Sequence, residues 1–246
     1  MSKFFVEPNQ INGSVITLTG ADVNHIAKVL RHTVGDVLCI CDGMGIDYEA
    51  QITAITREAV TLSVCGSKPC KTEPGVEVTL YQGLPKQGKM EWIIEKCTEM
   101  GISSIVPVQM ERSVVRLTAE QAEKKLVRWQ KTAEAAAKQC GRGKIPTVHM
   151  PILLSEISQQ TLPEFLLLPY EEETSQTVRE ALRGRKTKSA GIFIGPEGGF
   201  VPEEAAFLQR CGAQSVTLGP RILRTETAGL AALTVLLYEW GEMETV

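Results

Sequence analysis

The pattern of apolar residues changes near residue 75, and this change most constrains how the chain can fold. Up to about residue 70, short stretches rich in β-branched residues are separated by turn formers such as Asn12-Gly13. One helix interrupts them, with Asp22 as a plausible N-cap. Beyond residue 75, short apolar strands alternate with helical segments. The first pattern is typical of a small β-barrel, and the second indicates a parallel α/β sheet covered on both faces.

The segment 68–75 (KPCKTEPG) combines two prolines, a glycine and mixed charge, and it predicts a domain boundary. The chain then divides into residues 1–72 and residues 73–246. The expected strands are 14–18, 37–40, 48–55 and 60–64 in the first part, and 76–81, 105–108, 165–168, 191–194 and 215–218 in the second. Helices are expected over 90–100, over 119–140, from Pro202 and over 225–240. The last helix is apolar almost all round, so it needs a cover such as a subunit interface.

Composition and charge exclude several classes of protein. A hydrophobic fraction of 43% is that of an ordinary globular protein, which excludes disorder. No apolar run approaches the roughly 20 residues needed to span a bilayer, and the N-terminus lacks a signal-peptide core. We therefore expect a cytosolic protein without membrane contact. The seven cysteines are odd in number and lack C-x-x-C spacing, so we expect reduced thiols and no metal site.

Two loops follow predicted strands at the edge where parallel sheets bind ligands. The first, Gly195 to Phe200 (GPEGGF), has little side-chain bulk, so a ligand can approach its backbone closely. Its spacing matches neither a dinucleotide fingerprint nor a P-loop, which disfavours a nucleotide-binding module. Taken alone, it could equally be a simple Gly-Pro turn.

The second loop, residues 219–228, places Arg221 and Arg224 just before a helix start, with Glu226 two residues further on. Arginine at a helix N-terminus opposes the helix dipole, so these residues are a poor choice for stability alone. Either they serve a ligand, or Arg224 and Glu226 form a structural ion pair.

These motifs resemble those of a known family. GPEGGF at 195–200, LGPRILRTETA at 218–228, IIEKCTEMGISSIVPV at 93–108, QCGR at 139–142 and the His25…Val29-Leu30-Arg31 spacing are together similar to the bacterial ribosomal-RNA uridine-N3 methyltransferases of the SPOUT class, the small subunit methyltransferase E family. The resemblance covers essentially the whole chain.

The resemblance implies a PUA-like β-barrel domain over 1–72 and a SPOUT α/β domain with a deep trefoil knot over 73–246. It also implies S-adenosylmethionine as cofactor and a homodimer formed through the knotted domains. The cofactor-binding residues would be Leu168, Pro169, Gly195, Pro196, Glu197, Gly198, Leu218, Gly219, Ile222, Leu223, Arg224 and Thr227. Backbone groups of Leu218 and Leu223 would hold the adenine.

The implied reaction is methylation of N3 of a specific uridine in 16S ribosomal RNA of the small subunit. Loss of the N3 proton leaves negative charge on the flanking carbonyl oxygens, which Arg224 would stabilise. Glu226 and Glu197 are alternative bases, and the choice between them stays open. Because N3 lies on the pairing edge, the uridine must be unpaired or flipped out.

Basic residues predict how the RNA is held. Seven lie between Lys124 and Lys144 against one acidic residue, which RNA phosphates explain better than a merely solvated helix face. The expected RNA contacts are Lys3, Arg31, Lys86, Lys89, Lys138, Arg142, Lys144 and Arg221. Lys3 stands where family members often have arginine, and lysine lacks the planar fork. The alternatives are another SPOUT methyltransferase, acting on transfer RNA or a ribose hydroxyl, and a non-catalytic RNA-binding protein.

Overall fold

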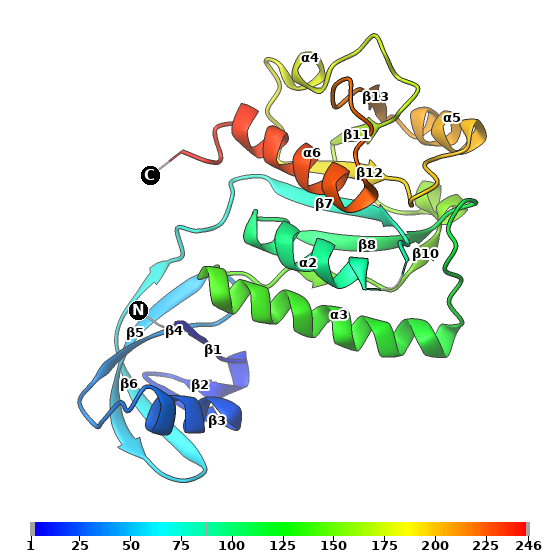
Figure 1. Ribbon diagram of the computed structural model, residues 1–246. Coiled ribbons are helices and arrows are strands. Elements are labelled where there is room, and N and C mark those ends of the chain that lie inside the picture. Colours follow the sequence, from blue (N-terminus) through cyan, green and yellow to red (C-terminus); the bar gives the residue numbers. More distant parts are fainter. Residues whose placement is uncertain (1–2, 87, 245–246) are drawn as a thin grey trace. The chain divides into compact units, whose positions relative to one another are not determined.

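The computed structural model describes residues 3–86 and 88–244 (Figure 1). It divides into two compact units. The first contains the residues up to Glu73 together with Ala137–Ile145, and the second contains Pro74–Ala136 and the residues from Pro146 onward. The grouping of residues 137–145 with the first unit has no counterpart in the sequence pattern. The single boundary between residues 72 and 73 stays a prediction.

The first unit is a six-stranded sheet with its own apolar core. In spatial order its strands are β1 (Lys3–Phe5), β4 (Val37–Cys41), β5 (Ile46–Ile55), β6 (Ala59–Pro69), β3 (Val15–Thr19) and β2 (Ile11–Asn12). The β1–β4 pair is parallel and the other neighbours are antiparallel. Ile16 and Leu18 of β3 alternate onto the core face opposite Leu62 and Val60 of β6. The sheet runs from β1 at one edge to β2 at the other, so a closed barrel stays a prediction.

The predicted helix of the first unit is less regular than its pattern indicates, and its N-cap is Gly20, so Asp22 lies inside the first turn. It consists of α1 (Ala21–Asn24) continued by a single π-helical turn over His25–Val29. Val23 and Ile26 are buried in the core of the sheet. Arg31 follows with a φ of 58°, a left-handed conformation that is uncommon for a residue other than glycine.

The second unit is built on a parallel sheet, as the sequence predicts. Its spatial order is β10 (Ile152–Leu153), β8 (Ser104–Gln109), β7 (Glu77–Gly83), β12 (Ser189–Ile194), β11 (Phe165–Pro169) and β13 (Gln214–Val216), with β9 (Thr147–Val148) beside β8. Within the described residues, every ladder in this sheet is parallel. The short strands β9 and β10 are not among those expected.

Helices cover both faces of this sheet: α2 (Lys89–Glu99), α3 (Ala119–Cys140), α4 (Val178–Leu182), α5 (Pro202–Arg210) and α6 (Thr225–Glu239). Val78 and Leu80 of β7 pack with residues of α2 and α6, such as Leu233. Tyr81 belongs to a second cluster with Phe193, whose ring is stacked on it at 4.5 Å between centroids. Alternate residues of one strand therefore face different helices, which explains why apolar residues occupy both alternating sets of positions in β7. The predicted helix starts at Pro202 and Thr225 are confirmed, whereas α4 was not expected.

The remaining global features set limits without naming a function. No helix of the described residues has the length and apolarity required to cross a membrane. Nor do residues 3–86 and 88–244 contain a group of three or more His, Cys, Asp or Glu side chains that could hold a metal ion. Because all strands of the second sheet are parallel, the segments that follow β7, β11 and β12 meet at one edge.

Candidate functional site

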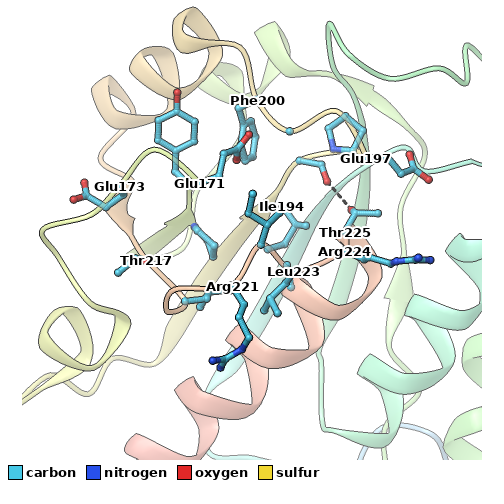
Figure 2. Close-up of a pocket in the computed structure, with 18 of the residues that line it drawn as sticks. Glu171, Glu173, Ile194, Glu197, Phe200, Thr217, Arg221, Leu223, Arg224 and Thr225 are labelled. Atoms are coloured by element: carbon cyan, nitrogen blue, oxygen red, sulfur yellow. Dashed lines mark hydrogen bonds between the residues drawn. The ribbon is translucent and has the colours of Figure 1, made fainter.

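A pocket of about 900 Å³ lies at this carboxyl edge of the second unit (Figure 2). Three segments form most of it: the residues after β11, the loop after β12 and the loop that connects β13 to α6. The lining residues are Lys89, Pro169, Tyr170, Glu171, Glu173, Thr174, Ile194 to Phe200, Thr217 to Thr225 and Ala228. The two loops singled out in the sequence therefore face one cavity.

The loop after β12 is closely packed, and its backbone conformation favours glycine at position 199. A Cβ on Gly195 would lie 3.0 Å from the carbonyl carbon of Gly199. Gly199 itself has a φ of 68°, a left-handed conformation that favours glycine, and it lies beside the carboxylate of Glu171. On the neighbouring strand, a Cβ on Gly83 would lie 2.5 Å from the nitrogen of Pro196. The glycines thus bring backbone, rather than side chains, to the wall of the pocket.

The loop that leads into α6 carries the two arginines. Arg224 is the residue directly before the helix, and Arg221 lies on the exposed part of the loop. Figure 2 shows their side chains pointing in different directions. Between them, Ile222 is 91% exposed, whereas Leu223 is half-buried against the pocket.

Both candidate bases share one cation. Nζ of Lys89 lies 3.0 Å from Oε2 of Glu226 and 3.2 Å from Oε1 of Glu197. The backbone N–H of Lys86 also donates to Oε1 of Glu197, at 2.9 Å. The structural ion pair considered for Glu226 therefore forms with Lys89, and no Arg224–Glu226 pair occurs among the described residues.

The electrostatics of this cluster keep both carboxyl groups ionised. Partial burial raises the pKa of Glu197, but hydrogen bonds from the Lys86 backbone and from Lys89 outweigh it, so the pKa lies below its ordinary value. Burial acts on Glu226 in the same way, and its own backbone N–H, Lys89 and the charge of Arg224 together lower its pKa. The pKa of Lys89 is raised, chiefly by its hydrogen bond to Glu226.

Arg112 holds the loop after β12 from another side, and the sequence reasoning did not select it. Its Nη1 donates to the carbonyl oxygens of Gly198 and Phe200, at 2.9 and 3.1 Å. A Cβ on Gly198 would lie 2.9 Å from Cβ of Arg112, so the two segments are in direct contact. Its sequence signal was weak, because a lone arginine in the segment after β8 has no distinctive spacing.

Comparison with known proteins identifies the family. A profile described as an RNA methyltransferase domain matches residues 72–237, and one described as an RNA methyltransferase PUA domain matches residues 18–65. Ribosomal RNA small subunit methyltransferase E of Bacillus subtilis is 34% identical over 249 residues, covering 97% of each chain. The chain belongs to the ribosomal RNA small subunit methyltransferase E family. The enzyme of that name from Mycobacterium tuberculosis is 31% identical, over 96% of this chain and 92% of its own.

Solved structures of the family agree over nearly the whole chain. The methyltransferase E of Neisseria gonorrhoeae, bound to S-adenosylmethionine, has a TM-score of 0.83 and 30% identity, covering 98% of each chain. A methyltransferase of Legionella pneumophila with the same cofactor bound has a TM-score of 0.82 and 27% identity, over 96% of this chain and 97% of that one. The resemblance inferred from the motifs is thus confirmed, including a PUA-like domain and a methyltransferase domain in a mixed α/β fold.

Most residues predicted to bind the cofactor line the pocket. These are Pro169, Gly195, Pro196, Glu197, Gly198, Leu218, Gly219, Ile222, Leu223 and Arg224. Leu168 is instead fully buried in the core, and Thr227 lies in the first turn of α6, where its N–H bonds to the carbonyl of Arg224. Glu226 does not line the pocket and reaches it through Lys89. The lining residues Tyr170, Glu171, Glu173 and Thr174 were not predicted, although they directly follow Pro169, which was.

The residues predicted to bind RNA fall in both units. In the second unit, Lys86 and Arg221 are exposed, and Lys89 is engaged by the two glutamates. In the first, Arg31, Lys138 and Lys144 are exposed.

Two of the predicted RNA contacts are already paired within the first unit. Lys3 is nearly buried, with Nζ 2.9 Å from Oδ1 of Asp47 and 3.3 Å from Sγ of Cys70. Arg142 is 4% exposed, and its Nη2 donates to Oε2 of Glu73 at 2.7 Å. Neither charge can reach a phosphate without breaking these contacts, so an RNA role for them stays a prediction that this geometry does not favour.

Proposed function

We propose that this chain transfers the methyl group of S-adenosylmethionine, bound in the pocket of the second unit, to N3 of a specific uridine in 16S ribosomal RNA of the small subunit. The observation that carries this proposal is the meeting of the 195–200 loop, the 217–225 loop and the Lys89–Glu197–Glu226 cluster around one cavity. The choice of cofactor and substrate rests on the family, whose members are named as ribosomal RNA small subunit methyltransferases and one of which binds S-adenosylmethionine.

The residues present suit this cofactor. Leu218, Leu223, Ile194 and Phe200 offer apolar surface for a purine, and the glycine backbone offers hydrogen-bonding groups without bulk. The pocket also contains carboxylates such as Glu171, which complement a positively charged ligand. When bound, the cofactor supplies an activated methyl group, so no metal or covalent enzyme intermediate is needed.

The chain's own residues then have two tasks. One is to remove the N3 proton, for which Glu226 and Glu197 both remain candidates because each is ionised at neutral pH and so can accept a proton. The other is to stabilise the negative charge that spreads to O2 and O4 of the uracil. Arg224, at the rim of the pocket, is suited to this second task because its guanidinium can donate two hydrogen bonds.

The remaining proposals concern the assembly. We expect a homodimer formed through the second unit, because α6 leaves Tyr238 72% exposed and several apolar residues only half-covered. We also expect a trefoil knot in the domain 73–246, a closed barrel in the domain 1–72 and action in the cytosol. Exposed basic residues such as Lys86, Lys144 and Arg221 would hold the RNA backbone.

The test is methyl transfer from labelled S-adenosylmethionine to small ribosomal subunits from a strain that lacks the family's enzyme. Digested nucleosides are identified by mass spectrometry. We expect N3-methyluridine with the wild-type protein and a loss of roughly a hundredfold or more in rate for Arg224→Ala. Arg210→Ala, which removes an exposed arginine of α5 outside the pocket, serves as the matched control.

Each outcome has a distinct meaning. Wild-type rates for Arg224→Ala would move the stabilising role to another residue and leave the reaction intact. A methylated ribose, or methylation of transfer RNA only, would refute the proposed substrate and favour another SPOUT activity. Cofactor binding without methylation of any RNA would support a non-catalytic RNA-binding protein.

A further inference from the structure

A buried chain of hydrogen bonds connects the end of β7 to both main loops of the pocket. Nε2 of Gln82 donates to Oγ1 of Thr225 at 2.8 Å, and this hydroxyl donates to the carbonyl oxygen of Gly195 at 2.6 Å. The second of these bonds is the dashed line at Thr225 in Figure 2. Gln82 is fully buried and Thr225 is 5% exposed. The loop after β12 and the first residue of α6 are therefore tied to the same side chain of the sheet.

The orientation of the Gln82 amide is determined by its neighbours. Nε2 also donates to the carbonyl oxygen of Gly83, at 3.1 Å, so it serves two acceptors. If the amide were rotated by 180°, Oε1 would face the carbonyl oxygen of Gly83 instead, and the two oxygens would repel each other. In the observed orientation Oε1 is buried and has no hydrogen-bond partner among the described residues. The unpaired buried acceptor lowers stability and offsets part of what the two hydrogen bonds from Nε2 contribute.

The position of Gln82 suggests a functional reason for a glutamine. Thr225 and Gly195 both line the pocket, whereas Gln82 does not. Beside it, a Cβ on Gly83 would lie 2.5 Å from the nitrogen of Pro196, so the 195–200 loop passes directly over the end of β7. A hydrogen bond that starts at Gln82 thus sets the orientation of a peptide group in the pocket wall.

We infer that Gln82 is a positioning residue for the cofactor: through Thr225, it holds the 195–200 loop and the start of α6 in the arrangement that binds S-adenosylmethionine. This inference rests on the proposed function. Without the relay, the two loops are free to adopt other arrangements, and the apparent affinity falls in proportion to the fraction that is competent to bind. Saturating cofactor restores the competent arrangement, so the loss appears in Kd and KM for the cofactor and not in kcat.

The first test is Gln82→Met, which keeps the side-chain length and removes both the donor and the unpaired acceptor. By calorimetry we expect the Kd for S-adenosylmethionine to rise about tenfold. We expect kcat at saturating cofactor to stay within about twofold of wild type. The melting temperature should change little, because loss of the two hydrogen bonds from Nε2 is offset by removal of the unpaired buried Oε1. Gln214→Met is the matched control, because Gln214 also has a buried, unpaired Oε1 but lies on β13 outside the pocket.

The second test breaks the relay at its other end. Thr225→Val keeps the shape and removes the hydroxyl, and Thr225→Ser keeps the hydroxyl, so valine should weaken cofactor binding more than serine. If Gln82 acts through Thr225, the double variant Gln82→Met/Thr225→Val binds the cofactor no more weakly than Thr225→Val alone. The comparison of valine with serine remains decisive if Gln82→Met does not fold.

Several results would overturn the inference. An unchanged Kd in Gln82→Met would show that the relay does not position the loops. A lowered melting temperature, with kcat reduced and Kd unchanged, would show a purely structural role. Additive losses in the double variant would show that Gln82 acts by another route. Failure of the wild-type protein itself to bind S-adenosylmethionine would instead refute the proposed function, which separates the two failures.

Discussion

Lys89 offers the sharpest test of the electrostatics at the site, through the variant Lys89→Met. The lysine contributes one positive charge to two carboxylates, with N···O distances of 3.0 Å to Glu226 and 3.2 Å to Glu197. Both glutamates have lowered pKa values, and Lys89 is among the causes in each case. Because an adjacent cation favours the ionised form, its removal must raise both pKa values.

The size of the effect follows from the exposure of the three side chains. Lys89 is 30% exposed, and Glu197 and Glu226 are 22% and 17% exposed, so solvent screens the contacts in part. Ion pairs of this kind contribute up to about 1 kcal/mol each. Since 1.36 kcal/mol corresponds to one pKa unit, the pKa of either glutamate should rise by roughly half a unit. The acid limb of the pH–rate profile, if it reports either base, should move to higher pH by the same amount.

The assay is the pH dependence of kcat/KM, which reports ionisations of the free enzyme and so matches the structure described. Lys96→Met is the matched control, because Lys96 lies on the same helix and also bridges two carboxylates, Glu95 and Glu99, away from the pocket. We expect its profile to be unshifted. A lower rate in Lys89→Met with an acid limb at the wild-type pH would refute the reasoning, because the lysine would then act without tuning a base.

Two further predictions concern residues that hold segments in place. Arg112→Lys should weaken cofactor binding several-fold by calorimetry, because lysine cannot reproduce the donation to the carbonyls of Gly198 and Phe200, whereas Arg116→Lys should leave it unchanged. Arg142→Ala should lower the free energy of unfolding by about 3 kcal/mol in urea titrations, because it leaves the nearly buried carboxylate of Glu73 without its cation. The additional substitution Glu73→Gln should recover part of that loss. Burial raises the pKa of Glu73, yet Arg142 and the backbone N–H groups of Gly143 and Lys144 hold it below the ordinary value. The wild-type contribution is therefore present above about pH 4.3 and is lost as the pH falls through the lowered pKa, and Arg142→Ala should remove this acid sensitivity.

The sequence predicted the elements whose patterns are strong. The parallel sheet was predictable because β12 and its neighbours are apolar on both faces, and the start of α5 because proline suits the first helical position. Strands of two residues, such as β9 and β10, carry too little pattern to be recognised. The grouping of residues 137–145 with the first unit was equally hidden, since it depends on contacts such as Arg142 with Glu73 across 69 positions.

The candidate site also has parts that could be predicted from the sequence and parts that could not. The loops 195–200 and 217–225 were predictable because both follow parallel strands and both are rich in residues with special backbone or charge properties. The cluster at Lys89 was not predictable, because its three members come from α2, the loop after β12 and α6. Charge in the sequence also does not reveal burial: Arg142, predicted as an RNA contact, is buried against the carboxylate of Glu73.

Gln82 carries a signal that the sequence does contain. Val76, Val78 and Leu80 alternate onto one face of the strand, and residue 82 is the next position on that face. A polar side chain there must be buried, and a buried amide requires hydrogen-bond partners. Those partners have to come from whatever covers the carboxyl end of the strand, which in a parallel sheet is the ligand-binding edge. A polar residue on the core face of a parallel strand, close to the strand's carboxyl end, therefore indicates which segments form the site. Gln82 does so through its hydrogen bond to Thr225.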